Sequence, residues 1–215
     1  MQIKWLGHAA FLLTARDGTR VITDPYATGA GLSYGQIKES ADVVLVSHEH
    51  GDHNNVAAIK GSPEVIRGAG THKAKGIEFR GVASFHDPSG GRQRGPNTIF
   101  CFTLDGVRLC HLGDLGHVLS GEQVAQIGQV DVLFLPVGGF YTIDAREATR
   151  VMGSLKPKIA IPMHFKTPKC DYPISPVEEF LQGKESVRRV GGSEVEVEAS
   201  SLPKATSVWV LEPAL

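Results

Sequence analysis

The 215-residue chain is 41% hydrophobic and 21% charged, which fits one soluble globular domain spanning residues 1–215. Its formal net charge of −1 gives no strongly basic surface of the kind with which proteins bind nucleic acid or anionic membranes. An apolar run at residues 9–13 is too short for a signal peptide or a membrane span, and three cysteines do not suggest a disulfide scaffold, so the cytoplasm is the default location.

The first half of the chain consists of short apolar segments separated by turn residues, which is typical of strands. Strands are predicted at residues 2–6, 10–14, 20–23, 43–46, 64–67, 75–79 and 82–85. The continuous apolar run at 43–46 is typical of a strand that is buried on both faces. Residues 54–60 favour a short helix that ends at Gly61. A polar, glycine-rich connection follows at residues 87–97 and is expected to be flexible.

The second half alternates between strands and helices. Strands are predicted at residues 98–104, 107–111, 131–136, 159–162, 187–190, 194–198 and 207–211. Helix starts are predicted by three capping-box patterns, Ser120 with Gln123, Asp144 with Glu147, and Ser175 with Glu178. The second of these helices should stop before Lys156-Pro157. We expect an α/β (αββα) fold, with two β-sheets packed face to face and helices on the outside.

The most informative pattern is the run His48-Glu49-His50-Gly51-Asp52-His53, which follows the buried strand at 43–46. Four residues with metal-binding side chains within six positions favour a metal site over a solvated loop. If the segment stays extended, His48, His50 and Asp52 lie on one face and His53 lies on the other. One loop would then present ligands in two directions, as two neighbouring metal ions require.

Further His and Asp residues follow other apolar, strand-like stretches, where α/β folds place their functional sites. These residues are Asp24, His86, Asp114 and His164. With the motif at 48–53 they give five strand ends that carry His or Asp.

This arrangement resembles the metallo-β-lactamase superfamily, in which an H-x-H-x-D-H motif is followed by a His, an Asp and a His. The likeness covers nearly the whole chain, through the segments 5–8, 23–25, 111–114 and 162–165. The segments around His8, Asp24 and His164 look most like the small stand-alone metal-dependent hydrolases. These are relatives of L-ascorbate 6-phosphate lactonase and, more distantly, of N-acyl phosphatidylethanolamine phospholipase D.

The resemblance implies a dinuclear centre. One ion would be held by His48, His50 and His86, the second by Asp52, His53 and His164, and Asp114 would bridge them. Nitrogen and oxygen ligands suit Zn²⁺, with Mn²⁺ or Fe²⁺ as alternatives. Two such cations lower the pKa of a shared water towards ~7 and polarise the substrate. Asp52 would mainly be a ligand, with a second duty in orienting the hydroxide or passing a proton.

Other residues have supporting roles in this hypothesis. Asp24 is expected to hold the metal loop through hydrogen bonds. His8 would either face the pocket or be a buried, hydrogen-bonded histidine, and both alternatives remain open. We expect His111 to belong to the core or to support a ligand, and His117 to line the pocket entrance.

An anionic group of a small-molecule substrate would find partners in Arg92, Arg94 and Lys166, unless these side chains are simply solvated. Tyr141 and its neighbour Phe140 are candidates for the pocket wall, although ordinary packing is an equal alternative.

The leading functional hypothesis is a dinuclear metal-dependent hydrolase that uses a metal-bridging hydroxide on a small ester, lactone or phosphoester. A diiron redox protein on the same fold is the main alternative, but such proteins resemble H-x-E-x-D-H, whereas position 50 here is His, and no flavin-binding domain is present. A non-catalytic metal-binding protein is a further alternative. The pocket loops contain no motif that names the substrate, and the sequence assigns no oligomeric state.

Overall fold

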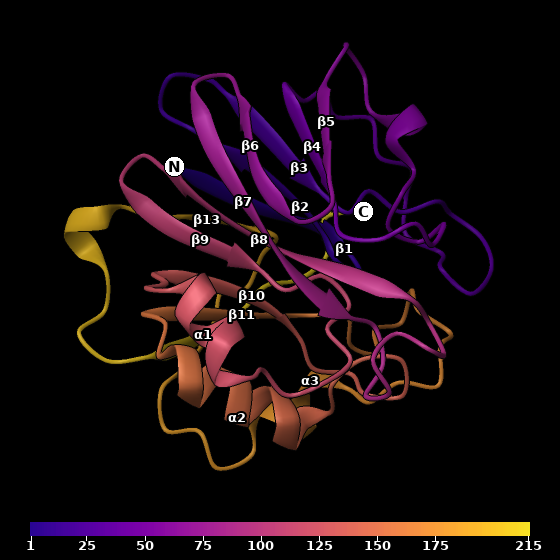
Figure 1. Ribbon diagram of the computed structural model, residues 1–215, viewed down its shortest axis with the longest axis vertical. Helices are drawn as coiled ribbons and strands as arrows, with labels where there is room; N and C mark the ends of the chain where they lie inside the picture. Colours follow the sequence, from indigo (N-terminus) through magenta and orange to yellow (C-terminus); the bar gives the residue numbers. More distant parts are fainter.

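The computed structural model, which describes residues 1–215, contains two β-sheets that face each other (Figure 1). The six-stranded sheet has the order β13 (Glu194–Glu196), β1 (Gln2–Gly7), β2 (Ala10–Thr14), β3 (Arg20–Thr23), β4 (Val43–Val46) and β5 (Glu64–Arg67). The eight-stranded sheet has the order β12 (Val187–Arg189), β14 (Ser207–Val210), β11 (Ile159–Met163), β10 (Val132–Pro136), β9 (Val107–His111), β8 (Pro96–Leu104), β7 (Ile77–Phe85) and β6 (Gly70–Ala74). The predicted αββα class is confirmed.

The outer faces of the two sheets are covered differently. Helices α1 (Gly121–Ile127), α2 (Ala145–Leu155) and α3 (Val177–Leu181) lie beside the eight-stranded sheet (Figure 1). The six-stranded sheet alternates its apolar side chains, so that Trp5 and Phe11 belong to the large core while Leu6 and Leu12 belong to a smaller cluster. This smaller cluster is completed by loop residues between 26 and 41, by Ile59, and by Cys170 and Ile174.

Two of the three predicted capping boxes are present. Ser120 and Gln123 cap α1 reciprocally, and Asp144 and Glu147 do the same for α2. The third prediction is wrong, because α3 begins after Pro176 without any side-chain cap. The backbone N–H of Ser175 donates to the carbonyl of Gly138 instead, at 2.7 Å.

Asp144→Ala is expected to lower the free energy of unfolding by about 1 kcal/mol, the usual loss for an N-cap. The capping carboxylate accepts from the Glu147 N–H at 2.8 Å, and the helix that it starts buries Ala148, Val151 and Leu155. Chemical denaturation measures the change, and Arg146→Ala on the exposed side of the same helix is the matched control. Equal stabilities of the two variants would contradict the capping role.

Other elements differ from the prediction for local reasons. The expected strands 75–79 and 82–85 form one continuous strand, β7. Gly81, within this strand, lies so close to the Gly68 carbonyl that a Cβ on residue 81 would be 2.3 Å from the carbonyl oxygen. The unpredicted strand β6 is largely polar and lies at the sheet edge. The helix expected at 54–60 is only one 3₁₀ turn, η1 (Val56–Ala58), and a second 3₁₀ turn, η2 (Ala199–Ser201), precedes β14.

The last strands, on either side of Gly191-Gly192, do not pair with each other. β12 runs parallel to β14, whereas β13 runs antiparallel to β1 in the other sheet. The chain therefore crosses between the sheets at the glycine pair.

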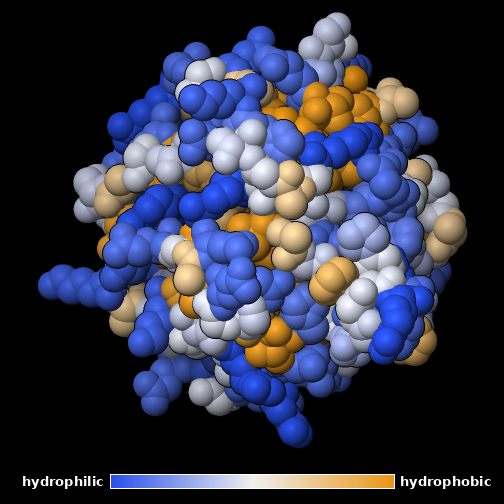
Figure 2. All heavy atoms as spheres, in the orientation of Figure 1, coloured by the Kyte–Doolittle hydropathy of each residue, from blue (hydrophilic) through white to orange (hydrophobic).

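No helix has both the length and the apolar composition needed to cross a bilayer. Figure 2 shows a mostly hydrophilic face on which apolar residues form small separate groups.

Candidate metal centre

The site is formed where strands end. β9, β10 and β11 run parallel, so their carboxyl ends lie at one edge of the eight-stranded sheet. Asp114 and His164 follow β9 and β11, and His86 directly follows the antiparallel strand β7. The motif at 48–53 follows β4 of the facing sheet, and His8 lies in the turn between β1 and β2.

Potential ligand atoms come together in three overlapping groups, each with all its atoms within 4.8 Å of one another. The groups are His48, His50 and His86; His8, Asp52, His53 and His164; and His48, His53 and Asp114. The structure thus brings all seven predicted ligands together and adds His8. The third group joins the other two.

Asp114 lies between the first two groups. Its Oδ2 atom is 3.2 Å from Nε2 of His53, 3.2 Å from Nε2 of His86 and 3.3 Å from Nε2 of His164. Burial alone would raise the pKa of Asp114, but the neighbouring His164 and His53 outweigh it and hold the pKa well below its usual value. A buried, charged carboxylate that faces both groups is suited to bridging two cations.

The Asp114 backbone is fixed by Asn97. The Asp114 N–H donates to Asn97 Oδ1 at 3.0 Å, and the Asn97 amide in turn donates to Leu112 O and to Ser84 Oγ. Gly113, at φ 54°, passes so close that a Cβ would lie 2.4 Å from Asn97 Oδ1. Glycine is favoured at this position because a side chain would clash with Asn97, which holds the Asp114 backbone, and with Ser47.

Asp24 fixes the tautomers of two histidines. Its carboxylate accepts from the backbone N–H of Ser47 at 2.7 Å, from Ser47 Oγ at 2.6 Å and from His53 Nδ1 at 3.1 Å. Because the Ser47 hydroxyl donates to Asp24, it accepts from His48 Nδ1, which lies 3.0 Å away. In their neutral forms both imidazoles therefore carry their proton on Nδ1 and present the Nε2 lone pair to the site.

The donor atoms fit a metal ion. Nε2 of His48, Nε2 of His53 and Oδ1 of Asp114 are buried and have no hydrogen-bond partner. Such orphaned atoms are costly in a folded protein unless something else binds them. Burial and the nearby His53 lower the pKa of His48 to about 3, so this imidazole is neutral, which is the form that a metal requires.

His53 shows that a positive charge is favoured here. Burial works against its protonation, but the carboxylates of Asp114 and Asp24 outweigh burial and raise the pKa of His53 well above its ordinary value. A divalent cation at the same place would replace that proton.

The expected alternation along the motif stops at His50. The His53 N–H donates to the His50 carbonyl at 2.9 Å, so the chain turns. Asp52 consequently joins His53 rather than His48 and His50, and the parity argument was wrong for Asp52. The loop still presents ligands in two directions, but through a turn.

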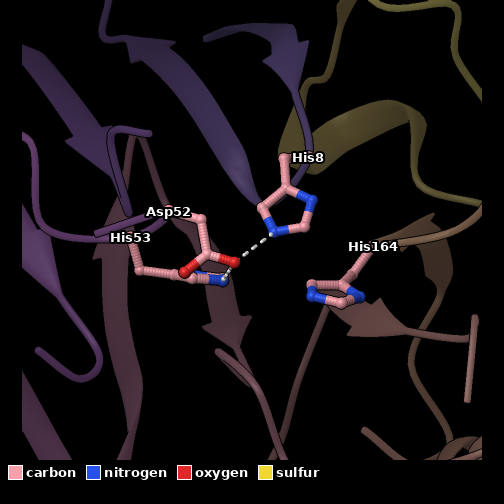
Figure 3. A group of neighbouring side chains, drawn as sticks. All are labelled: His8, Asp52, His53 and His164. Carbon is pink, nitrogen blue, oxygen red and sulfur yellow. Dashed lines mark ion pairs between the residues drawn. The ribbon is translucent and has the colours of Figure 1, made fainter. Parts of the chain in front are cut away.

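His8 lies in the second group, beside Asp52, His53 and His164 (Figure 3). Its Nε2 atom is 3.3 Å from Asp52 Oδ2. Its backbone has φ 51°, and its carbonyl accepts from Trp5 Nε1 at 3.1 Å and from the His164 N–H at 3.2 Å. These bonds hold the turn after β1 against the end of β11.

The other histidines do not face the site. His111 Nδ1 accepts from the Gly113 N–H at 3.2 Å, and Nε2 donates to Ala9 O at 3.0 Å, which confirms a buried structural role. His117 accepts from the Phe85 N–H and donates to Val118 O, and it lines a separate hollow instead of the pocket entrance. That expectation was wrong.

A cavity of about 290 Å³ opens onto the ligand groups. Its lining residues are His50, Asp52, His86, Arg94, Asp114, Tyr141, His164 and Tyr172. The guanidinium of Arg94 lies over the Tyr141 ring, 5.5 Å from its centroid. A larger hollow of about 620 Å³ near Arg80 and Arg108 contains none of the candidate ligands.

The three predicted anion-binding cations lie in different places. Arg94 lines the cavity, whereas Arg92 is exposed and does not. Lys166 is also outside it, and its ammonium donates to the carbonyl of Tyr172 at 2.9 Å. Phe140, 63% exposed, packs edge-on against Tyr141 but does not line the cavity.

The expected flexible connection at 87–97 is an ordered loop organised by Asp87. This carboxylate accepts from the Ser89 hydroxyl and from the backbone N–H groups of Ser89, Gly91, Gln93 and Arg94. Burial alone would raise the pKa of Asp87, but these hydrogen bonds outweigh it and lower the pKa. The loop therefore holds Arg94 beside the ligands, and the Asp-Pro-Ser step after His86 is the sequence signal for such a turn.

The sequence reasoning missed Ser47, Asn97 and Tyr172. The Tyr172 hydroxyl donates to Asp52 Oδ2 at 3.4 Å and lines the cavity. Ser47 is adjacent to the motif, and a hydroxyl beside a ligand is a signal that could have been used. Tyr172 has no such signal, because its loop carries no recognisable pattern.

Comparisons with known proteins agree with this geometry. A profile of the family described as "Beta-lactamase superfamily domain" matches residues 2–164. A UPF0173 metal-dependent hydrolase from Archaeoglobus fulgidus is 33% identical, over 78% of this chain and 84% of that protein.

Solved structures also resemble this chain. The crystal structure of a proposed Zn-dependent hydrolase of the metallo-β-lactamase superfamily from Thermotoga maritima has 39% sequence identity and a TM-score of 0.82, over 98% of both chains. A diiron β-hydroxylase from Streptomyces venezuelae shares the fold alone, with 16% identity and a TM-score of 0.53 over 76% of this chain and 44% of that one. The placement beside L-ascorbate 6-phosphate lactonase stays a prediction. The chain belongs to the beta-lactamase superfamily and, within it, to the UPF0173 family of metal-dependent hydrolases.

Proposed function

We propose that this chain hydrolyses a small ester, lactone or phosphoester at a centre of two divalent ions. The observation that carries this proposal is Asp114, which lines the cavity and whose Oδ2 lies within 3.3 Å of imidazoles from both ligand groups. Zn²⁺ is the preferred ion, because imidazole and carboxylate ligands without cysteine suit it, and Mn²⁺ and Fe²⁺ are the alternatives.

The bound ions would activate water at neutral pH and polarise the bond to be cleaved. His48, His50 and His86 would hold one ion, and Asp52, His53 and His164 the other. Asp114 would keep the two together, while Asp24 and Ser47 keep His48 and His53 in the tautomer that binds metal.

Asp52 is suited to orienting water as well as holding an ion. Its side chain is 22% exposed, it lines the cavity, and its Oδ2 receives the Tyr172 hydroxyl at 3.4 Å. Burial would raise its pKa, but His8 and His53 outweigh burial and lower the pKa, so that Asp52 is a carboxylate at neutral pH. It can therefore orient water through one oxygen while it holds an ion.

The cavity restricts the substrate. At about 290 Å³ it lies at the lower end of the range for small-molecule pockets. Arg94 is its only lysine or arginine, and its guanidinium lies over Tyr141. A small substrate with one carboxylate or phosphate group fits this arrangement.

Arg94→Ala is expected to lower kcat/KM for an anionic substrate by about tenfold or more, equivalent to the ~1.5–3 kcal/mol of a charged hydrogen bond. Arg92→Ala is the matched control, because Arg92 is in the same loop but outside the cavity. A neutral analogue should be affected by neither substitution. Equal losses on the anionic and neutral substrates would show that Arg94 does not bind the anion.

The proposed function is tested by a reconstitution screen. Metal-free protein is loaded with Zn²⁺, Mn²⁺ or Fe²⁺ and assayed on lactone, phosphodiester, phosphomonoester and thioester substrates. We expect one ester class to be turned over and a chelator to abolish the activity. Loaded protein that consumes oxygen instead would favour the diiron redox alternative, and loaded protein inert to every class would favour a binding protein.

A further inference from the structure

His8 is a buried histidine whose ring nitrogens make no hydrogen bond of good geometry. Its side chain is 1% exposed, and neither Nδ1 nor Nε2 has a hydrogen-bond partner. His111, which is equally buried, has a partner for each ring nitrogen. Burying an imidazole without partners is costly, so a group outside the protein is expected to bind His8.

The rings around His8 are spaced like those of the group formed by His48, His50 and His86. The His8 ring centroid is 5.0 Å from that of His53 and 4.1 Å from that of His164, and His53 and His164 are 5.9 Å apart. In the other group, the three centroid distances between His48, His50 and His86 are 4.7, 4.8 and 5.2 Å. Three imidazoles therefore surround a common space in each group.

Asp52 completes the arrangement at His8. Its Oδ2 atom is 3.3 Å from His8 Nε2 and 3.8 Å from His53 Nε2. In Figure 3 the His8 ring faces Asp52, and His53 and His164 lie on other sides of the same space. The left-handed backbone of His8, at φ 51°, is unusual for a residue other than glycine and is the kind of local strain that functional sites contain.

We propose that His8 is a direct metal ligand, in addition to Asp52, His53 and His164. This inference rests on the proposed dinuclear centre. It makes the two subsites unequal, because His8, Asp52, His53 and His164 form a four-residue set, whereas His48, His50 and His86 form a three-residue set, and the bridging Asp114 adds one ligand to each. With five protein ligands against four, the His8 subsite leaves less room for water or substrate than the other subsite does.

The two subsites should exchange their metal ions at different rates. Three of the four residues in the His8 set are at most 1% exposed, whereas His50 in the other set is exposed and lines the cavity. The ion in the His8 subsite should bind more tightly and leave more slowly. The ion near His50 should be the exchangeable one that meets the substrate.

The alternative is that His8 only donates a hydrogen bond to Asp52. The two roles are distinguished by NMR of protein labelled with ¹⁵N-histidine and loaded with ¹¹³Cd²⁺, because scalar coupling between cadmium and nitrogen requires a direct bond. We expect one cadmium signal to couple to nitrogens of His8, His53 and His164. His8→Gln should remove one of these couplings and weaken the tighter dissociation constant by about tenfold or more. His117→Gln, outside the ligand groups, should change neither.

The wild-type spectrum decides the question even if His8→Gln does not fold. Two bound cadmium ions with no coupling to His8 would overturn this inference and leave the dinuclear centre intact. Failure of the wild-type protein to bind cadmium or zinc at these residues would overturn the proposed function and this inference with it.

Discussion

Asp114→Asn is expected to reduce turnover by at least about a hundredfold while the protein remains folded. The amide keeps the shape of the carboxylate but removes the negative charge that faces His53, His86 and His164 within 3.3 Å. Without that charge, one anionic ligand fewer offsets the repulsion between the two cations. The rate is measured on the substrate class found in the screen, and bound metal is determined in the same samples.

The control for this variant is Asp171→Asn, the same substitution at an exposed carboxylate outside the ligand groups. It should leave the rate and the metal content unchanged. An Asp114→Asn protein with both ions and a wild-type rate would show that Asp114 is not the bridging ligand.

Asp24→Asn is expected to weaken metal binding by ~10–100-fold, as is usual when a residue that orients a ligand is lost. In the wild-type protein, Ser47 Oγ and His53 Nδ1 both donate to the Asp24 carboxylate. In the variant, the new amide group presents N–H donors to these two donors. At least one of these groups loses its acceptor, and the tautomers of His48 and His53 are no longer fixed. Loss of the buried, charged hydrogen bonds should also lower the free energy of unfolding by about 2 kcal/mol or more.

The substitution should not add backbone strain, because Asp24 has φ 38° and asparagine adopts that region readily. Asp17→Asn is a suitable control, since Asp17 is exposed and bonds only to the nearby Thr19 N–H. Metal titration and denaturation should both distinguish the variants. An Asp24→Asn protein with wild-type metal affinity would contradict the role assigned to Asp24.

Much of the site could be predicted because its residues follow strands. An apolar run marks a strand, its end marks a sheet edge, and parallel strands bring Asp114 and His164 to the same edge. The same reasoning failed beyond His50, since the alternation rule holds only while the chain is extended, and a backbone hydrogen bond turns it at His53.

Residues that depend on contacts between distant segments could not be predicted. Tyr172 contacts Asp52, which is 120 positions away in the sequence, and no pattern in the Tyr172 loop predicts this contact. The segments on either side of Gly191-Gly192 have the pattern of a hairpin, yet each pairs with a different sheet. Local patterns identify strands, but the partner of a strand is decided by the packing of the whole core.

The most direct test of the dinuclear centre is to count the metal ions in protein saturated with Zn²⁺ and freed of excess metal. Two groups of ligands joined by Asp114 exceed what one tetrahedral ion can use. We therefore expect two ions per chain by elemental analysis. A single tightly bound ion per chain in fully active protein would contradict the dinuclear centre.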